Sequence, residues 1–153
     1  MERNPSPRNN ILTDSMQLPQ AYIKVEELKT RKGKIILYTS PTRSLVYAEA
    51  SGYISLGLLK QDLAFVSDFD QSQTQAWTYL VNTAQVRFAH PLNPFFLNQL
   101  KNMIHLKLYI VYIPSPVLRF INRSFGKLIP IDQLLKSEQE LYSILHEHTL
   151  LKD

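Results

Sequence analysis

The chain has 153 residues, of which 44% are hydrophobic and 20% are charged, and its formal net charge is +4. This length and hydrophobic fraction suit one folded domain with a substantial core and argue against a wholly disordered chain. Because the chain has no cysteine and only four glycines, disulfide scaffolds, thiol catalysis and cysteine-based zinc sites are excluded, and glycine-rich phosphate loops have little room.

The two ends of the chain have the composition of tails. Residues 1–20 are rich in Asn, Pro, Ser and Gln, so we expect a flexible segment there. The first ten residues lack the apolar core of a secretory signal, and no apolar run approaches the roughly 20 residues that span a bilayer. We therefore expect a cytoplasmic protein with a single domain over 21–148 and a short tail at 149–153.

The first half of the domain contains a hairpin and a helix. Residues 22–32 begin with strand-like alternation and continue with charges that suit a helix, so an edge strand and a short helix both stay open. Residues 34–40 and 45–50 are rich in strand-forming side chains and flank a proline-containing turn, which predicts a β-hairpin. Ser55 is the predicted cap of a helix to about Asp70, because apolar residues then recur at intervals of three and four.

Strands and helices alternate along the rest of the chain. A capping residue followed by proline marks two helix starts, at Asn93-Pro94 and at Ser115-Pro116. Strands are predicted over 77–83, 106–113 and 128–131, and helices from Asn93, from Pro116 to Ser124 and from Asp132 to His146. This alternation predicts an α/β fold: a mixed, mostly parallel sheet of four to five strands with an N-terminal hairpin and about four helices.

Three segments carry a resemblance to a known family. They are Gly52–Ser55 after the hairpin, Ala76–Thr83 along the central strand and Ile129–Leu135 at the last predicted strand. Their order and spacing resemble the SpoIIAA-like branch of the STAS superfamily, the anti-sigma-factor-antagonist fold. The resemblance implies a STAS-like domain that is not an enzyme and that acts as a regulatory module through contacts with a protein partner.

The chain departs from the family in its phosphorylation loop. In anti-sigma-factor antagonists a serine in this loop is phosphorylated, which breaks partner binding. When the two loops are aligned on Val86, Asn82 replaces the aspartate at the strand end, and Pro91 and Leu92 stand where the serines should be. Since neither of these two side chains has a hydroxyl, the serine phosphoswitch is predicted to be lost.

Charge is unevenly distributed along the chain. Residues 71–131 contain six basic residues and no Asp or Glu, whereas the remainder is slightly acidic. In the helix predicted from Pro116, Arg119 and Arg123 are four residues apart and share a face, with Phe120 between them. A basic helix with aromatic neighbours suits contact with an anionic lipid, a small anionic ligand or a membrane surface, although a solvated basic face beside core residues stays open.

The remaining polar residues indicate no catalytic site. His90 precedes a helix at the carboxyl end of a predicted central strand, where open α/β sheets place ligands, but a histidine that binds only the local backbone is the alternative. His146 and His148 are two apart on a helix and point to different faces, so no metal site is expected. The acidic residues Asp62, Asp68 and Asp70 are expected on a solvated helix face.

The sequence thus predicts a binding module with no cofactor, no metal and no catalytic residue. Its candidate site residues are His90, Asn93, Phe95, Arg119, Phe120 and Arg123. The expected partner is a protein or an anionic lipid or small ligand, and a homodimer stays open. Nucleic acid is disfavoured, because the basic residues form no dense stripe and no recognition motif is present.

Overall fold

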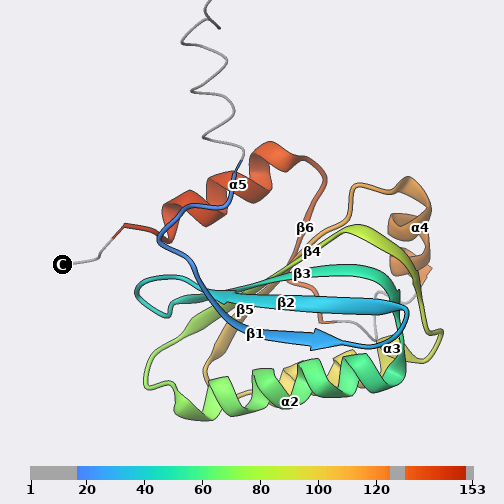
Figure 1. Cartoon of the computed structure of the whole chain (residues 1–153), viewed down its shortest axis with the longest axis horizontal. Helices are drawn as coiled ribbons and strands as arrows, with labels where there is room; N and C mark the ends of the chain where they lie inside the picture. Colours follow the sequence, from blue (N-terminus) through green and yellow to red (C-terminus); the bar gives the residue numbers. More distant parts are fainter. Residues whose placement is uncertain (1–16, 125–129, 151–153) are drawn as a thin grey trace, which may run out of the picture.

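The computed structural model of the chain describes residues 17–124 and 130–150. Within these ranges six strands form one sheet in the order β1-β2-β3-β4-β5-β6 (Figure 1). The strands are β1 (Ile23–Lys29), β2 (Gly33–Thr39), β3 (Leu45–Ile54), β4 (Trp77–Ala89), β5 (Leu106–Tyr112) and β6 (Gln133–Leu135). β1, β2 and β3 are antiparallel neighbours, and β3 to β6 run parallel.

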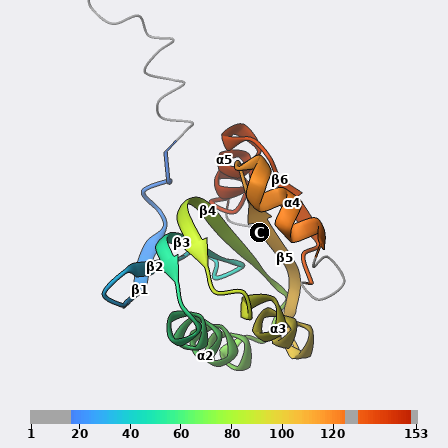
Figure 2. The ribbon, with the colours of Figure 1, turned by 90° about the vertical axis from the view of Figure 1, so that its right-hand side faces the viewer.

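Helices cover both faces of this sheet. They are α2 (Leu56–Ser72), α3 (Asn93–Leu97), the 3-10 helix η1 (Asn98–Asn102), α4 (Pro116–Ser124) and α5 (Glu138–Glu147). Figures 1 and 2 show α2 and α3 on one face and α4 and α5 on the other. The predicted α/β class, mixed sheet and N-terminal hairpin are confirmed, and the sheet of the described residues has more strands than predicted.

Two hydrophobic cores lie on the opposite faces of the sheet. Successive residues of a strand point to opposite faces, so Tyr79 of β4 belongs to the core under α2, whereas Leu80 belongs to the core under α5. Leu63 and Val66 of α2 complete the first core, and Leu141 of α5 is fully buried in the second. β4 is therefore covered on both sides, as its continuous apolar sequence predicts.

The segment 22–32, for which strand and helix were both open, forms the edge strand β1. The next two differences from prediction are linked. β3 continues to Ile54 instead of ending at residue 50, and β4 continues to Ala89 instead of ending at residue 83, because the two strands stay paired as far as Ile54 opposite Ala89. Residues 84–88 alternate between apolar and polar side chains, a strand signal that the prediction overlooked, and their pairing with β3 confirms it.

Gly52 lies inside the extended β3 instead of closing the hairpin. Its φ angle is +74°, a conformation that glycine adopts without strain. A Cβ at this position would lie 2.4 Å from the carbonyl oxygen of Lys32, so the close approach of the two chain segments also requires glycine.

The end of the chain differs most from prediction. The last strand is β6 at 133–135, not 128–131; residues 128 and 129 lie outside the described residues, and Pro130 and Ile131 are not in a strand. Asp132 directly precedes β6 and does not begin a helix. Its Oδ2 accepts a hydrogen bond from the Tyr109 amide of β5 at 2.7 Å. α5 starts after Ser137, whose side chain and that of Glu140 form a reciprocal capping box.

The helical segment after Asn93 is shorter than predicted, because Asp70 binds the chain that follows it. The helical spacing of Phe96, Leu100, Met103 and Ile104 predicts a longer apolar stripe, but Met103 and Ile104 lie beyond η1, and Ile104 is exposed. The Asp70 carboxylate accepts hydrogen bonds from the Ile104 amide at 2.7 Å, the His105 amide at 2.9 Å and the Trp77 indole at 2.8 Å. Asp70 is 2% exposed, so the prediction that it lies on a solvated helix face was wrong.

None of the helices in the described part of the chain combines the length and the apolar character that a membrane span requires. The predicted tails at 1–20 and 149–153 fall largely outside the described residues.

Candidate functional site

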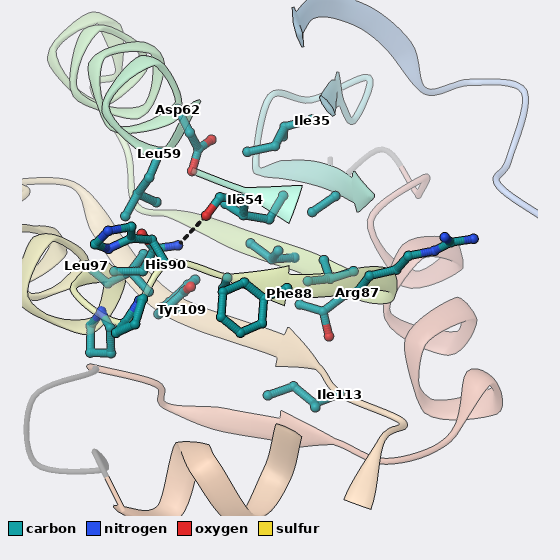
Figure 3. Close-up of a pocket in the computed structure, with 18 of the residues that line it drawn as sticks. Ile35, Ile54, Leu59, Asp62, Arg87, Phe88, His90, Leu97, Tyr109 and Ile113 are labelled. Atoms are coloured by element: carbon teal, nitrogen blue, oxygen red, sulfur yellow. Dashed lines mark hydrogen bonds between the residues drawn. The ribbon is translucent and has the colours of Figure 1, made fainter. Parts of the chain in front are cut away.

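A pocket of about 380 Å³ opens at the carboxyl edge of the sheet, on the face that α2 covers. The wall is formed by the ends of β3, β4 and β5, by α2, by the segment from β4 to α3, and by the first turn of α4 (Figure 3). Its apolar side chains include Ile35, Ala50, Ile54, Leu59, Val81, Val86, Leu97 and Ile113. Ligand pockets of α/β proteins commonly lie at this edge, and this volume is within their usual range.

Among the described residues of the wall, Asp62 is the one acidic side chain, and it extends from α2 toward the strands (Figure 3). Its Oδ1 accepts a hydrogen bond from the Tyr79 hydroxyl at 2.5 Å. Burial raises the pKa of Asp62 to about 6, and the Tyr79 hydrogen bond offsets only part of this effect. Asp62 is 4% exposed, so the prediction of a solvated helix face was wrong here too, whereas Asp68 is exposed as expected.

Asn93 is buried in the wall, with 6% of its surface exposed. Its side-chain Nδ2 donates to the carbonyl oxygen of Ile54 at 3.1 Å, the dashed line in Figure 3, and thereby joins the start of α3 to the end of β3. Leu92, not Asn93, is the N-terminal capping position of α3. The Oδ1 atom of Asn93 is buried and has no hydrogen-bond partner among the described residues.

His90 lies half-buried in the same wall, directly after β4. Its Nδ1 accepts a hydrogen bond from the Leu92 amide at 3.1 Å, and its own amide donates to the Ile54 carbonyl at 3.0 Å. His90 therefore binds the local backbone and shapes the turn between β4 and α3, as one of the two alternatives predicts. It also lines the pocket.

The sequence identified only part of this pocket. Of the six predicted site residues, His90 and Asn93 line it, whereas Phe95, Arg119, Phe120 and Arg123 do not. The first turn of α4 contributes Val117. Asp62 was missed, although the pattern contained a signal: with Leu59, Leu63 and Val66 it falls on the apolar stripe of α2.

Exposed large apolar side chains lie on the segments that contribute to the pocket wall. We call Phe88, Leu92, Phe95, Val117 and Phe120 the edge surface; between 47% and 70% of each residue's surface is exposed. Phe88 and Val117 also line the pocket, so β4 and α4 meet there. The Phe88 ring stacks on Tyr53, with 5.6 Å between the ring centroids, which fixes the position of the exposed ring.

The segment that aligns with the family's phosphorylation loop is mostly strand. β4 includes residues 82–89, and the turn begins only at His90. The Thr83 hydroxyl donates to the carbonyl oxygen of Tyr112 at 2.7 Å, and Asn82 Oδ1 accepts from the Ala84 amide at 2.9 Å. Among the described residues no group of three or more metal-binding side chains is present.

Similarity to known proteins is structural. No family model matches the sequence, and no curated protein is similar enough to match it. The structure of the anti-sigma factor antagonist SpoIIAA in its unphosphorylated form superimposes with a TM-score of 0.55 at 19% identity, over 77% of this chain and 99% of that one.

The chain has a SpoIIAA-like fold. An uncharacterized DUF3478-family protein from Shewanella loihica, described as having a SpoIIAA-like fold, gives a TM-score of 0.49 at 9% identity, over 83% of this chain and 97% of that one. The resemblance that the three sequence segments carry is confirmed at the level of the fold.

Proposed function

We propose that the protein is a cytoplasmic, non-catalytic interaction module of the STAS type and that it contacts a protein partner through the edge surface. The observation that carries this proposal is the presence of five exposed large apolar side chains on three segments that contribute to one pocket: the end of β4, the turn into α3 with α3 itself, and α4. Exposed apolar side chains that cluster in this way mark binding sites, whereas isolated ones are common on any protein. Aromatic residues, three of the five here, are also enriched in protein interfaces.

The charges near the edge surface indicate what kind of partner fits. Arg87 and Arg123 are exposed, and in the sequence they lie close to Phe88 and Phe120 of the edge surface. Residues 71–131 contain no acidic side chain. A partner surface with an apolar centre and acidic surroundings would complement this arrangement, because opposite potentials speed encounter and disfavour wrong partners. A second copy of this chain is a weaker candidate, since its edge surface would bring the same positive charge.

The contact is proposed to work without the serine switch of the family. Pro91 and Leu92 offer no hydroxyl at the positions of the serines, and the Thr83 hydroxyl is engaged with the Tyr112 carbonyl. A partner would therefore be released through its own concentration or modification, not through phosphorylation of this loop.

Replacing Phe95 and Val117 together by serine is expected to reduce partner binding at least tenfold, because each buried apolar side chain contributes about 1.5–3 kcal/mol. A matched control replaces Ile23 and Ile104, exposed apolar residues outside the edge surface, by serine. The measurement is recovery of co-purifying proteins on each variant, followed by a binding isotherm with the purified candidate. A saturable partner that the control retains and the edge variant loses supports the proposal. Equal binding to both variants, or no saturable partner, contradicts it.

The α4 helix supports a second candidate function, binding of an anionic lipid, a small anionic ligand or a membrane surface. Arg119 and Arg123 are one helical turn apart on α4, and Phe120 and Val117 are exposed beside them. Such a helix can place aromatic and aliphatic side chains at the level of lipid headgroups while its cations meet their phosphates.

Reversing the charge of Arg119 and Arg123 to glutamate tests this second function. Each cation near an anionic bilayer contributes about 1 kcal/mol, so the double variant should bind vesicles of phosphatidylglycerol and phosphatidylcholine at least about 30-fold more weakly. The control reverses Lys29 and Lys32, exposed cations near β1, and should bind as the unmodified chain does. If the chain does not sediment with these vesicles, or if both variants sediment alike, this second function is wrong.

A further inference from the structure

The pocket contains two hydrogen-bond acceptors that the fold does not use. Asn93 Oδ1 is buried and unpartnered among the described residues. Asp62 uses its Oδ1 for the Tyr79 hydroxyl, and no described residue donates to its Oδ2. A buried acceptor without a donor costs about 1–3 kcal/mol, so native structures retain such atoms mainly where a ligand or water meets them.

Two donors around the pocket are already engaged, whereas His90 keeps one: its Nδ1 accepts from the Leu92 amide, so its Nε2 carries the ring proton. Asn93 Nδ2 donates to the Ile54 carbonyl, and Thr83 donates to the Tyr112 carbonyl. The Arg87 side chain points away from the other labelled residues in Figure 3, and the Tyr109 hydroxyl, which can donate or accept, belongs to the wall. The described wall thus offers acceptors, the Tyr109 hydroxyl and the His90 Nε2 donor within an otherwise apolar enclosure.

We propose that this pocket binds a small neutral amphiphile: an apolar body with a terminal hydroxyl that donates to the free Oδ2 of Asp62. A hydroxyl can also accept from Tyr109, which an ammonium group cannot do. A carboxylate has no proton to donate and would meet the negative charge of Asp62. This ligand is recognised by Asp62 inside the pocket, whereas the edge-surface partner and the anionic ligand at α4 are recognised by exposed groups, although Phe88 and Val117 belong both to the edge surface and to the pocket wall.

The test compares two probes with the same tail length, 1-octanol and octanoate, at pH 7.5. Each is titrated into the full chain, and amide shifts are followed by two-dimensional NMR. Octanol should cause saturable shifts at Asp62 and along residues 86–93, with a dissociation constant at least tenfold lower than that of octanoate. Octanol shifts that do not saturate, or that lie outside the pocket, overturn the proposal, as does equal affinity for the two probes.

Asp62→Asn changes the preference if the assignment is right. The asparagine presents an NH2 group where the carboxylate oxygen stood, so octanoate gains a donor and loses a repulsion. The dissociation constant of octanoate divided by that of octanol should fall at least tenfold in Asp62→Asn. Asp68→Asn, an exposed change on the same helix, should leave this ratio unchanged. An unchanged ratio in folded Asp62→Asn overturns the role of Asp62. If that variant does not fold, the comparison of octanol with octanoate on the unmodified chain decides whether the pocket prefers the neutral ligand.

Discussion

Asp70→Ala is expected to lower the free energy of unfolding by at least about 3 kcal/mol. The carboxylate receives three hydrogen bonds, and each bond to a charged group contributes about 1.5–3 kcal/mol. Its loss leaves the buried Trp77 indole without an acceptor and releases the chain after η1 from the end of α2. Urea denaturation of both proteins measures the effect.

Asp68→Ala is the matched control for this change. Asp68 is exposed two residues earlier on α2, so its replacement should change the free energy of unfolding by less than about 0.5 kcal/mol. A loss of under 1 kcal/mol in Asp70→Ala would show that the three contacts do not hold the two segments together.

The ionisation of Asp70 should also be visible in the pH dependence. Burial alone would raise the pKa of Asp70, but hydrogen bonds from Trp77, His105 and Ile104 more than offset this and lower it. A lowered folded-state pKa adds stability that is fully present above the unfolded-state pKa of about 3.9 and is lost as pH falls through the folded-state value. Asp70→Ala should therefore lose less of its stability than the unmodified chain does on acidification below about pH 4.

Asp62→Asn has the opposite expected effect and should stabilise the protein at neutral pH. Burial raises the pKa of Asp62 from 3.8 to about 6, so the folded state holds its proton over a pH range in which the unfolded state has lost it. Stability contributed by this group is complete below the unfolded-state pKa and falls as pH rises to about 6. Above that pH the buried carboxylate lowers the free energy of unfolding by about 3 kcal/mol.

The measurement is the difference in free energy of unfolding between Asp62→Asn and the unmodified chain at two pH values. This difference should increase by about 2 kcal/mol from pH 4.5 to pH 7.5, because asparagine keeps an acceptor for the Tyr79 hydroxyl but carries no charge. Other carboxyl groups cancel in the comparison. A difference that stays constant with pH would show that the carboxyl titrates as an exposed one does.

These two aspartates also show where reasoning from the sequence stops. Both lie on the stripe of α2 that packs against the sheet: Asp62 follows Leu59 by three residues, and Asp70 follows Val66 by four. Helical periodicity therefore places them on the buried face, but an acidic residue is ordinarily exposed. Their partners, Tyr79 and Trp77, lie on β4, and only the tertiary structure identifies them.

Helix and strand boundaries were predicted correctly where a signal within the same turn of the chain determines them. Ser55 and Pro116 gave correct helix starts, because capping and proline act within one helical turn. The start of α5 was predicted five residues too early, although Ser137 and Glu140 have capping-box spacing. The extension of β4 to Ala89 follows its pairing with β3, and the alternation of apolar and polar residues over 84–88 was a signal for it that the prediction did not use.

The candidate site, too, could be predicted from the sequence only in part. Its location at the carboxyl edge of the sheet follows from topology, which the alternation of strands and helices predicts. Its chemistry does not, because Asp62, Tyr109 and Asn93 come from three elements that only the folded chain brings to one pocket. The basic residues of α4 gave the stronger sequence signal, yet they lie outside the pocket wall.

Amide hydrogen exchange of the full chain, with and without a purified partner, shows whether the edge surface makes the functional contact. Binding should slow exchange at residues 88–97 and in the first turns of α4, while β1, an edge strand of the sheet, exchanges as before. Protection confined to β1 and β2, with residues 88–97 unchanged, would rule out a contact through the edge surface.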